Sequence, residues 1–430
     1  MKAAFVTLGC KVNQYESNAL EQLLRENGFT VVSAKDDADV YIVNSCTVTA
    51  ESSRKSRQAL RRMRQTHPQA VIVLTGCYAQ AYSDALASLP EADIVLGTKQ
   101  NRQLPNIILD YVQQRQRIVC VAPHEKTDTY DCVGAASFEG HTRAFIKIQD
   151  GCNRRCTYCI IPKSRGFSRS RSPEEIKQEL NAIAENGYKE VVFVGINLSA
   201  YGLDIQKNIC DALLLAQEQP GIERIRLGSL EPDHITDEVI AGLSGMSKFC
   251  PQFHLSLQSG SNTILKRMNR HYTAEEYETL CNKLKDAFPA LSLTTDIICG
   301  FPGETQRDFA ETVAFAEKIG FLKVHVFPYS RRVGTPAASY PDQVEKIEKL
   351  RRCAILQESC DAVRLRILAS AVGSNRNVLF ETPKNGLQHG YTENYTPVVV
   401  QSEALLTGQI KTVEITGVKD GVCTGILKET

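Results

Sequence analysis

Gly151-Cys152-Asn153-Arg154-Arg155-Cys156-Thr157-Tyr158-Cys159 places three cysteines in C-x3-C-x2-C spacing. The apolar run Ala144–Ile148 comes just before it, which predicts a strand that ends in a cysteine-bearing loop. Structural zinc sites and ordinary iron–sulfur sites are closed by four protein ligands, whereas this loop supplies three thiolates and has no histidine nearby. The spacing therefore predicts a metal cluster with one open coordination position.

An open iron in a three-thiolate cubane is what the reductive cleavage of S-adenosylmethionine (SAM) requires. The amine and carboxylate of the methionine moiety can chelate that iron, and an electron passed into the sulfonium releases a 5′-deoxyadenosyl radical. Tyr158 stands between the second and third cysteines and is expected to lie against the adenine. The motif resembles the radical-SAM signature. The alternative is a zinc knuckle or three buried thiols.

Length and composition set bounds on the rest of the chain. With 430 residues, 43% of them hydrophobic, the chain is long enough for two or three domains. The formal net charge of +1 gives no global sign of nucleic-acid binding, so such contacts must come from local patches. Neither a basic-then-apolar leader nor a bilayer-length apolar run is present, which predicts a cytoplasmic protein without membrane contact. Its fifteen cysteines then point to metal ligation and buried thiols.

The amino-terminal third alternates apolar strand patterns with helical patterns. Strands are expected at Ala3–Leu8, Val40–Val43 and Val71–Leu74, and helices near Gln14–Asn27, Ser52–Gln65 and Ala79–Ala87. Such alternation is typical of an α/β domain with an open parallel sheet covered by helices.

One cysteine follows each of these three strands: Cys10, Cys46 and Cys77. The carboxyl ends of parallel strands form one edge of a sheet, so these thiols are expected to converge. Any one of them alone is better explained as a small buried hydrophobe. Three at equivalent positions predict a second cluster, again with three thiolates and an open iron. An electron relay has no need of a vacant iron, whereas a cluster that carries an exogenous sulfur atom does.

A basic pattern marks the second expected helix, where Arg54, Arg57, Arg61 and Arg64 recur every three or four residues. Two interpretations remain open for it, a solvated face and a contact with a phosphate backbone.

The alternation restarts at Arg143 and gives about six further strand–helix units. Strands are expected near Phe145–Ile148, Val191–Val194, Ile225–Leu227, Phe253–Leu257, Leu293–Ile298 and Val324–Phe327. Six units are too few for a complete eight-stranded barrel, so the pattern predicts an open partial (β/α)6 barrel with ligands at the carboxyl ends of its strands. Residues at those ends are the candidates for SAM binding: Tyr158, Gly195, Asn197, Ser229, Glu231, Ser256, Gln258 and Ile298.

The pattern changes again after a last long helix, expected from Asp342 to about Leu368. Short strand-like runs with many glycines follow, which predicts a small all-β barrel. Phe380, Tyr391 and Tyr395 are candidates for stacking on RNA bases, with core packing as the alternative. The expected domains are residues 1–133, 138–367 and 368–430.

These features together resemble the radical-SAM methylthiotransferase family over essentially the whole chain. Leu8-Gly9-Cys10-Lys11-Val12-Asn13-Gln14-Tyr15-Glu16-Ser17 is most similar to the branch that acts on N6-threonylcarbamoyladenosine of tRNA, the MtaB branch. The isopentenyladenosine branch typically has Gly-Cys-Gln-Met-Asn there, and the branch that modifies a ribosomal-protein aspartate has Gly-Cys-Pro-Lys-Asn. The resemblance also implies that the carboxyl-terminal barrel is a TRAM module.

The resemblance implies two 4Fe-4S clusters and SAM as cofactors, with Cys10, Cys46 and Cys77 as ligands of one cluster and Cys152, Cys156 and Cys159 as ligands of the other. It implies replacement of the C2 hydrogen of the modified adenosine at position 37 by a methylthio group. The expected partners are the anticodon stem-loop of tRNA, an external electron donor and a sulfur source. Three arginines that follow the loop of Cys152, Cys156 and Cys159 are expected to hold anticodon-stem phosphates: Arg165, Arg169 and Arg171.

Three alternatives stay open at this point. The same chemistry on isopentenyladenosine or on a ribosomal-protein aspartate would change only the substrate. An RNA-binding module with structural zinc is of another class, and it predicts a colourless protein without iron–sulfur absorbance.

Overall fold

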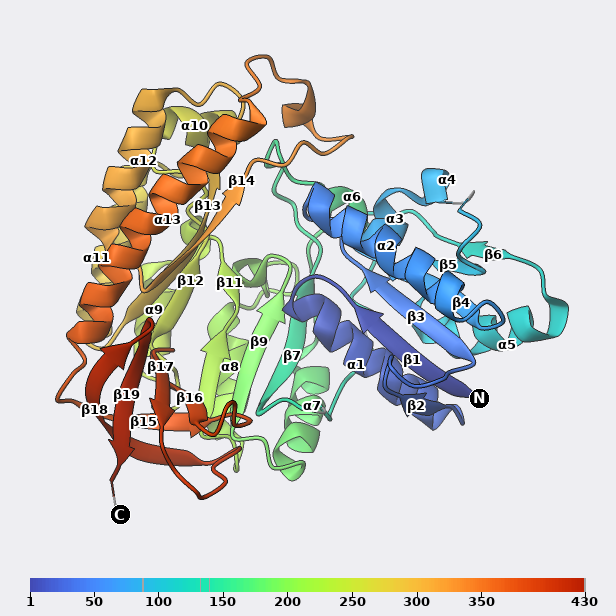
Figure 1. Ribbon diagram of the computed structural model, residues 1–430, viewed down its shortest axis with the longest axis horizontal. Coiled ribbons are helices and arrows are strands. Elements are labelled where there is room, and N and C mark those ends of the chain that lie inside the picture. Colours follow the sequence, from blue (N-terminus) through green and yellow to red (C-terminus); the bar gives the residue numbers. More distant parts are fainter. Residues whose placement is uncertain (87–88, 132, 139, 429–430) are drawn as a thin grey trace.

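The computed structural model describes residues 1–86, 89–131, 133–138 and 140–428, and its amino-terminal part is a six-stranded parallel sheet in the order β2-β1-β3-β4-β5-β6 (Figure 1). The strands are β1 (Lys2–Thr7), β2 (Thr30–Val32), β3 (Val40–Ser45), β4 (Val71–Gly76), β5 (Ile94–Leu96) and β6 (Ile118–Cys120). The three expected strands are β1, β3 and β4. The other three have three residues each, too few to carry a readable pattern.

Helices cover both faces of this sheet. They are α1 (Lys11–Glu26), α2 (Ala50–Thr66), α3 (Cys77–Ala81), α4 (Ser83–Leu86), the 3-10 turn η1 (Asn101–Gln103) and α5 (Leu104–Gln114). Leu20 of α1 packs with Ile108 of α5 in one core, and Leu60 of α2 packs with Tyr78 of α3 in another. The helix expected at Ala79–Ala87 instead begins at Cys77 and is interrupted at Tyr82, whose φ of −130° is not helical; residue 87 lies outside the described residues.

The central part is an open partial barrel made of two adjoining sheets, β10-β9-β7-β8 and β11-β12-β13-β14. Its strands are β7 (Arg143–Asp150), β8 (Arg169–Ser170), β9 (Glu190–Gly195), β10 (Arg224–Leu227), β11 (Ser229–Leu230), β12 (Gln252–Leu255), β13 (Ser292–Cys299) and β14 (Lys323–Pro328). The six expected strands are confirmed as β7, β9, β10, β12, β13 and β14. Only the two-residue strands β8 and β11 were not expected, and β8 is antiparallel to β7.

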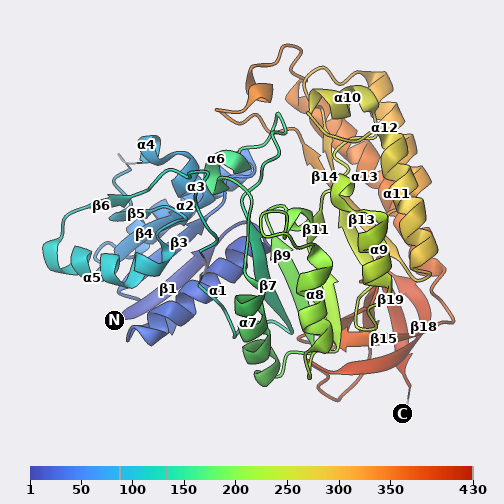
Figure 2. The same cartoon turned by 180° about the vertical axis from the view of Figure 1, so that it is seen from behind.

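The long helices of this part lie on the outside of the strands, whereas α6 lies beside α3 of the amino-terminal part (Figures 1 and 2). The helices of this part are α6 (Ile161–Arg165), α7 (Pro173–Glu185), η2 (Leu198–Ala200), α8 (Ile209–Glu218), η3 (Pro232–His234), α9 (Asp237–Ser244), α10 (Asn262–Arg267), α11 (Ala274–Ala287), α12 (Gln306–Ile319), η4 (Pro336–Ser339) and α13 (Lys346–Ala369). The last helix begins four residues later than the expected Asp342. Asp342 has a φ of +58° and Glu345 is extended, so neither can continue a right-handed helix.

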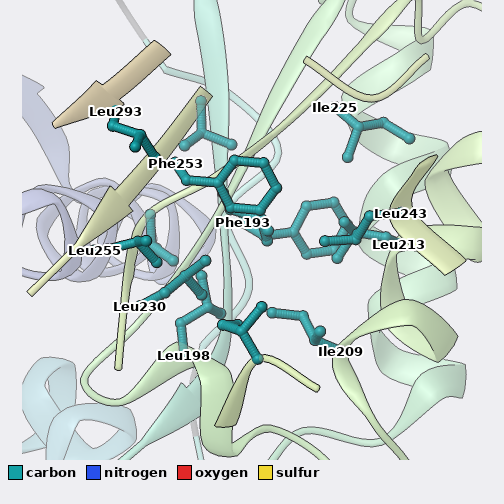
Figure 3. Close-up of a cluster of buried hydrophobic side chains, with 14 of the residues drawn as sticks. Phe193, Leu198, Ile209, Leu213, Ile225, Leu230, Leu243, Phe253, Leu255 and Leu293 are labelled. Atoms are coloured by element: carbon teal, nitrogen blue, oxygen red, sulfur yellow. The ribbon is translucent and has the colours of Figure 1, made fainter. Parts of the chain in front are cut away.

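Successive side chains along the strands alternate in direction, so one set packs in the outer core and the other faces the barrel interior. Phe253, Leu255 and Leu293 point toward the helices and join the apolar layer shown in Figure 3. Because successive side chains of a strand point to opposite faces, the residues between them face the interior. Burying such large side chains contributes roughly 1.5–3 kcal/mol each, which fixes the register of the strands.

The carboxyl-terminal part is a closed five-stranded barrel in the order β15-β16-β17-β19-β18. The strands are β15 (Asn375–Phe380), β16 (Gln388–Thr392), β17 (Pro397–Val400), β18 (Ile410–Lys419) and β19 (Val422–Leu427). It packs against the amino ends of the central strands: Arg143, the first residue of β7, pairs with Glu381 at 2.7 Å, and Arg224, the first residue of β10, donates to the Asn377 carbonyl at 2.8 Å. The opposite, carboxyl ends of the strands are left for a site. None of the described helices is both long and apolar enough to cross a bilayer.

Candidate metal centres

Cys10, Cys46 and Cys77 follow β1, β3 and β4, which are neighbours in the sheet. Asn13 links two of the thiols, because its Oδ1 lies 3.7 Å from the Cys10 Sγ and 4.0 Å from the Cys77 Sγ. Gly9 has a φ of +112°, and a Cβ there would lie 3.0 Å from the Cys46 Sγ. The chain thus brings the three thiols together around a turn that has no space for a side chain.

A buried arginine holds this group of thiols. Arg165 is fully buried and donates through Nε to the Cys77 Sγ at 3.1 Å and through Nη2 to Asn13 at 3.3 Å. Its guanidinium also makes a two-point ion pair with Glu16, whose carboxylate accepts from Lys147 at 2.7 Å. The basic charge therefore lies where bound thiolates would place negative charge.

Burial and this arginine act on the Cys77 thiol in opposite directions. Burial raises the pKa of Cys77 to about 11, although Arg165 acts to lower it. Burial alone would also raise the pKa of Glu16, but Arg165 and Lys147 hold it below its ordinary value. Without a metal the thiols stay protonated, and a bound metal would displace those protons.

The second group of thiols lies in the loop after β7. Gly151 has a φ of +73°, and a Cβ there would be 1.8 Å from the carbonyl oxygen of Phe167, so only glycine fits. The backbone N–H of Cys152 donates to the Gly166 carbonyl at 3.0 Å, and that of Cys159 donates to the Cys156 carbonyl at 3.0 Å. Burial and, to a smaller extent, the neighbouring Cys156 raise the pKa of Cys152 to about 11, although the backbone N–H of Arg154 acts to lower it.

A second buried arginine, Arg270, contacts this loop, and no pattern in the sequence predicts it. Arg270 donates through Nη1 to the Cys156 Sγ at 3.3 Å and pairs with Glu231. Its Nη2 donates to the Ser256 carbonyl at 3.2 Å. Arg270 follows α10 in a short turn with no motif around it, so only the fold shows that it reaches the cysteine loop.

The two groups of thiols fit a multi-metal cluster better than a single zinc ion. With Zn–S bonds of about 2.3 Å, tetrahedral geometry separates two sulfurs by roughly 3.8 Å. Among the described residues, however, neither cysteine trio has all of its sulfurs within 4.8 Å of one another. Three neighbouring thiols that are too far apart for one zinc ion match the cysteine donors of an iron–sulfur cluster.

The SAM candidates lie at the carboxyl ends of the strands, as their positions predicted, and most of their polar contacts are now visible. The ring of Tyr158 packs edge-to-face on Phe301, 6.4 Å between centroids, beside Ile298. The Asn197 N–H donates to the Gln149 Oε1 at 2.7 Å, and a Cβ on Gly195 would lie 3.0 Å from the same side chain.

The four remaining candidates differ in their surroundings. Ser229 is exposed at the start of β11. The Ser256 carbonyl accepts from the Tyr272 hydroxyl at 2.5 Å, and Gln258 has a φ of +69°. Glu231 forms an ion pair with Arg270, so a ligand at this position would contact the ion pair and not a lone carboxylate. Their contacts with SAM remain predictions.

The expectation that Arg165, Arg169 and Arg171 bind phosphates is wrong. All three are buried and their guanidinium groups are used inside the protein. Arg169 donates to the Arg165 carbonyl at 2.8 Å, and Arg171 pairs with Glu179. The spacing of these arginines in the sequence is typical of a surface patch. They lie, however, on and after α6 and β8, which stand between the amino-terminal sheet and the central barrel.

The basic pattern on α2 is only partly a surface feature. Arg54 and Arg61 are exposed, whereas Arg57 donates to the Tyr78 hydroxyl at 2.9 Å and Arg64 pairs with Asp93 at 2.5 Å. Arg54 itself pairs with Glu51. The continuous stripe is therefore not present, and a contact between RNA and the exposed arginines stays a prediction.

The aromatic candidates of the carboxyl-terminal barrel have internal roles. Phe380 is fully buried in the barrel core, so its predicted stacking on a base is wrong. Tyr391 and Tyr395 stack on each other with 4.5 Å between centroids, and Arg226 lies over the Tyr395 ring at 4.8 Å. These two partly buried rings pack against Arg143 and Arg226 at the amino ends of the central strands, and their stacking on RNA bases stays a prediction.

Comparison with known proteins finds three family models that match separate stretches of the chain. The model of the Radical SAM superfamily matches residues 146–316, that of Uncharacterized protein family UPF0004 matches residues 2–97, and that of the TRAM domain matches residues 369–428. Threonylcarbamoyladenosine tRNA methylthiotransferase MtaB of Bacillus subtilis is 41% identical over 96% of this chain and 93% of its own length. The protein of that name from Thermotoga maritima is 38% identical over 90% of this chain and 89% of its own length.

A relative with another name is somewhat more distant. The tRNA-2-methylthio-N(6)-dimethylallyladenosine synthase of Pelotomaculum thermopropionicum is 33% identical over 99% of this chain and 97% of its own length. Among solved structures, the radical S-adenosylmethionine methyltransferase TsrM of Kitasatospora setae matches 90% of this chain and 80% of its own, with a TM-score of 0.56 and 14% identity. At that identity the likeness supports the fold alone.

Proposed function

The chain belongs to the radical-SAM methylthiotransferases, and from this premise we infer that it replaces the C2 hydrogen of N6-threonylcarbamoyladenosine at position 37 of tRNA with a methylthio group. The observation that carries this proposal is the pair of cysteine trios, each with a buried arginine on one thiol. They are neighbours, because α6 begins two residues after Cys159 and ends at Arg165, which contacts Cys77. No side-chain base can remove an aryl hydrogen of this kind, so a cofactor radical is required.

We assign one 4Fe-4S cluster to Cys152, Cys156 and Cys159, and a second to Cys10, Cys46 and Cys77. When bound, the first cluster supplies with SAM the 5′-deoxyadenosyl radical, and the second presents the sulfur that is methylated and transferred. Arg270 and Arg165 offset the negative charge of the thiolates in an interior of low dielectric constant. Tyr158 and Ile298 give the adenine of SAM an apolar wall, and Gly195, Asn197, Ser229, Glu231, Ser256 and Gln258 border the same pocket.

The identity of the modified nucleoside follows the more similar relatives. Relatives that share 36–41% of their residues with this chain bear the threonylcarbamoyladenosine name, and relatives with the dimethylallyladenosine name share 33–35%. Isopentenyladenosine is therefore the second candidate. A ribosomal-protein aspartate is the third, supported only by the common chemistry.

The three parts of the chain divide the work in this proposal. Residues 1–133 hold the sulfur-carrying cluster, 138–367 generate the radical, and 368–430 bind RNA as a TRAM-like barrel. The exposed arginines of α2 make a further contact with the anticodon stem-loop of the tRNA. The electron donor and the sulfur source are external, and the reaction takes place in the cytoplasm.

Nucleoside mass spectrometry of tRNA from a strain that lacks the gene tests the proposal. We expect 2-methylthio-N6-threonylcarbamoyladenosine to disappear and its unmethylthiolated precursor to accumulate. Loss of the isopentenyl derivative instead would move the assignment to the second candidate, and an unchanged tRNA profile would contradict a tRNA substrate. Independently, Cys152→Ala should abolish 5′-deoxyadenosine formation while about half of the iron is retained.

A further inference from the structure

The inner face of the barrel carries a polar layer that neither cluster uses. It consists of His254 on β12, Asp296 on β13 and His325 on β14. The possible ligand atoms of these residues all lie within 4.8 Å of one another, and no other trio of His, Cys, Asp or Glu in the described residues is as compact. The His254 Nε2 is 3.3 Å from the Asp296 carboxylate, and the two imidazole centroids are 5.9 Å apart.

The alternation of the strands shows which way this layer faces. His254 stands between Phe253 and Leu255, which pack in the outer core, so its ring points into the barrel. His325 likewise follows the buried Val324. Two residues further along the same strands, Ile298 and Phe327 continue the inner face toward the SAM candidates. The polar layer is thus next to the SAM pocket, on the side away from the carboxyl ends.

The layer has unused hydrogen-bonding capacity. The His254 Nδ1 lies 3.0 Å from the Thr294 hydroxyl, but among the residues that the structure describes its buried Nε2 has no well-aligned hydrogen-bond partner. Buried polar groups of folded proteins are nearly always satisfied, which suggests that a ligand completes this one. Asp296 and His325 are only partly buried and remain accessible from the interior.

An unpaired lysine from the amino-terminal part adds positive charge to the same space. Lys11 is the first residue of α1 and follows Cys10 directly. Its side chain is exposed, and within the described part of the chain its ammonium has no hydrogen bond and no ion pair. Lys11 begins the helix that packs against β7 and β9, and its neighbour Val12 lies in the core of the barrel. Its ammonium acts electrostatically on His325, and Arg226, Arg143 and Glu190 act on Lys11. The interior therefore offers cationic and hydrogen-bonding groups beside a proposed cluster ligand.

An exposed aromatic ring borders the layer on the edge strand. Phe327 is 42% exposed, which is unusual for an inward-facing phenylalanine, and its ring is stacked on His325 with 6.5 Å between centroids. Such a ring gives a purine a stacking surface. These groups suit a planar base with a polar, anionic substituent. The base would stack on Phe327, and the substituent would meet His325 and Lys11.

We propose that His254, Asp296, His325 and Lys11 form the subsite for the threonylcarbamoyl substituent of the target adenosine. This inference rests on the proposed function. The free carboxylate of the substituent accepts from the Lys11 ammonium and an imidazole N–H of His325, and its hydroxyl donates to Asp296. The purine lies on Phe327, which directs C2 toward the thiols of the amino-terminal group. An isopentenyl substituent would leave Lys11 and His325 without partners, so the subsite discriminates against it.

The test compares binding of two anticodon stem-loops, one with N6-threonylcarbamoyladenosine and one with unmodified adenosine at position 37. Reconstituted wild-type protein, Lys11→Gln, His325→Leu and the control Lys283→Gln are measured anaerobically. Lys283 is exposed on α11 and pairs with Asp237, away from the barrel interior. We expect Lys11→Gln and His325→Leu to weaken binding of the modified stem-loop on the order of tenfold or more, with little change for the unmodified one. The control should match the wild type.

Two further measurements keep this test distinct from that of the proposed function. Iron content and SAM binding of the variants show whether the clusters and the SAM pocket are intact. If wild-type protein methylthiolates the modified stem-loop but Lys11→Gln and His325→Leu bind both stem-loops as the wild type does, the subsite is wrong and the function stands. Stoichiometric zinc, manganese, cobalt or nickel that His325→Leu removes would also overturn it, because the layer would then be a metal site.

Discussion

At the scale of single residues, buried ion pairs decide which arginines are available to a substrate. Arg165, Arg169 and Arg171 look in the sequence like a phosphate-binding group, yet each is buried, and each has a carboxylate partner. A buried charge that loses its partner costs several kcal/mol, so these pairs act as fixed parts of the interior.

Glu190 offers a residue-scale prediction about pH. It is fully buried and contacts Arg143 at 2.7 Å and Arg226 at 3.0 Å. Burial would raise its pKa, but these arginines and Arg224 lower it from 4.5 to about 2. Because the folded-state pKa lies below the unfolded-state value, the stabilisation, about 3 kcal/mol, is present above pH 4.5 and is lost as the pH falls toward 2.

We therefore expect Glu190→Gln to lower the thermal unfolding midpoint at pH 7 by several degrees and to flatten its decline between pH 5 and 3. Thermal unfolding of wild type and variant across that range measures both effects. Glu223→Gln is the control, since Glu223 pairs with Lys189 on the surface and should change little. Equal pH profiles for Glu190→Gln and wild type would contradict the role of the buried carboxylate.

A second residue-scale prediction concerns Arg270. Arg270→Met keeps much of the side-chain volume but leaves the partly buried Glu231 without its cation and removes a donor from the Cys156 Sγ. We expect weaker SAM binding and a shifted reduction potential of the cluster at this loop, with the iron content retained. Electrochemical titration followed by electron paramagnetic resonance measures the potential. An unchanged potential would show that the contact with Cys156 is only structural.

At the scale of elements, the turns after strands determine whether the cysteine loops can form. Gly9 and Gly151 both have a positive φ and no space for a Cβ, and each precedes a cysteine. This part of the site was predictable, because strand patterns followed by Gly-Cys place thiols at the carboxyl edge of a parallel sheet.

Other parts of the site were not predictable because they depend on tertiary contacts. Arg270 reaches Cys156 across more than a hundred residues of sequence, and no local pattern marks it. The layer of His254, Asp296 and His325 requires the register of three strands, in which Asp296 is opposite His325. The prediction that Phe380 stacks on a base is wrong because an aromatic residue in a strand gives the same sequence pattern whether its side chain faces a core or a ligand.

Gly151→Ala tests the turn. A Cβ in contact with the Phe167 carbonyl and a positive φ should prevent the loop from closing, so about half of the iron and all SAM cleavage should be lost. Gly187→Ala is a matched control, because Gly187 has a φ of +79° but no atom within 4 Å of its Cβ position. Iron analysis and 5′-deoxyadenosine formation distinguish the two; similar losses in both variants would attribute the effect to backbone strain in general.

At the scale of the whole molecule, the amino-terminal part is joined to the barrel by a continuous core and a charged network. Val12 and Tyr15 of α1 belong to the same apolar cluster as the barrel strands. Beside them Glu16 pairs with both Arg165 and Lys147, and Lys147 pairs with Asp150 at 2.8 Å. This network runs from the helix after Cys10 to the strand before Cys152, so it fixes the distance between the two groups of thiols.

Glu16→Gln should therefore separate radical formation from sulfur transfer. The substitution leaves the buried Arg165 and Lys147 with Asp150 as their remaining carboxylate, which loosens the junction but touches no thiol of the radical-forming loop. We expect 5′-deoxyadenosine still to form while the methylthiolated product falls severalfold, so their ratio rises; liquid chromatography with mass spectrometry measures both. Glu26→Gln is the control, since Glu26 is exposed on the same helix and accepts a hydrogen bond from Gln22. If Glu16→Gln lowered both products in parallel, the network would be needed for stability alone, and the spacing between the thiol groups would have to be set by the apolar contacts of α1.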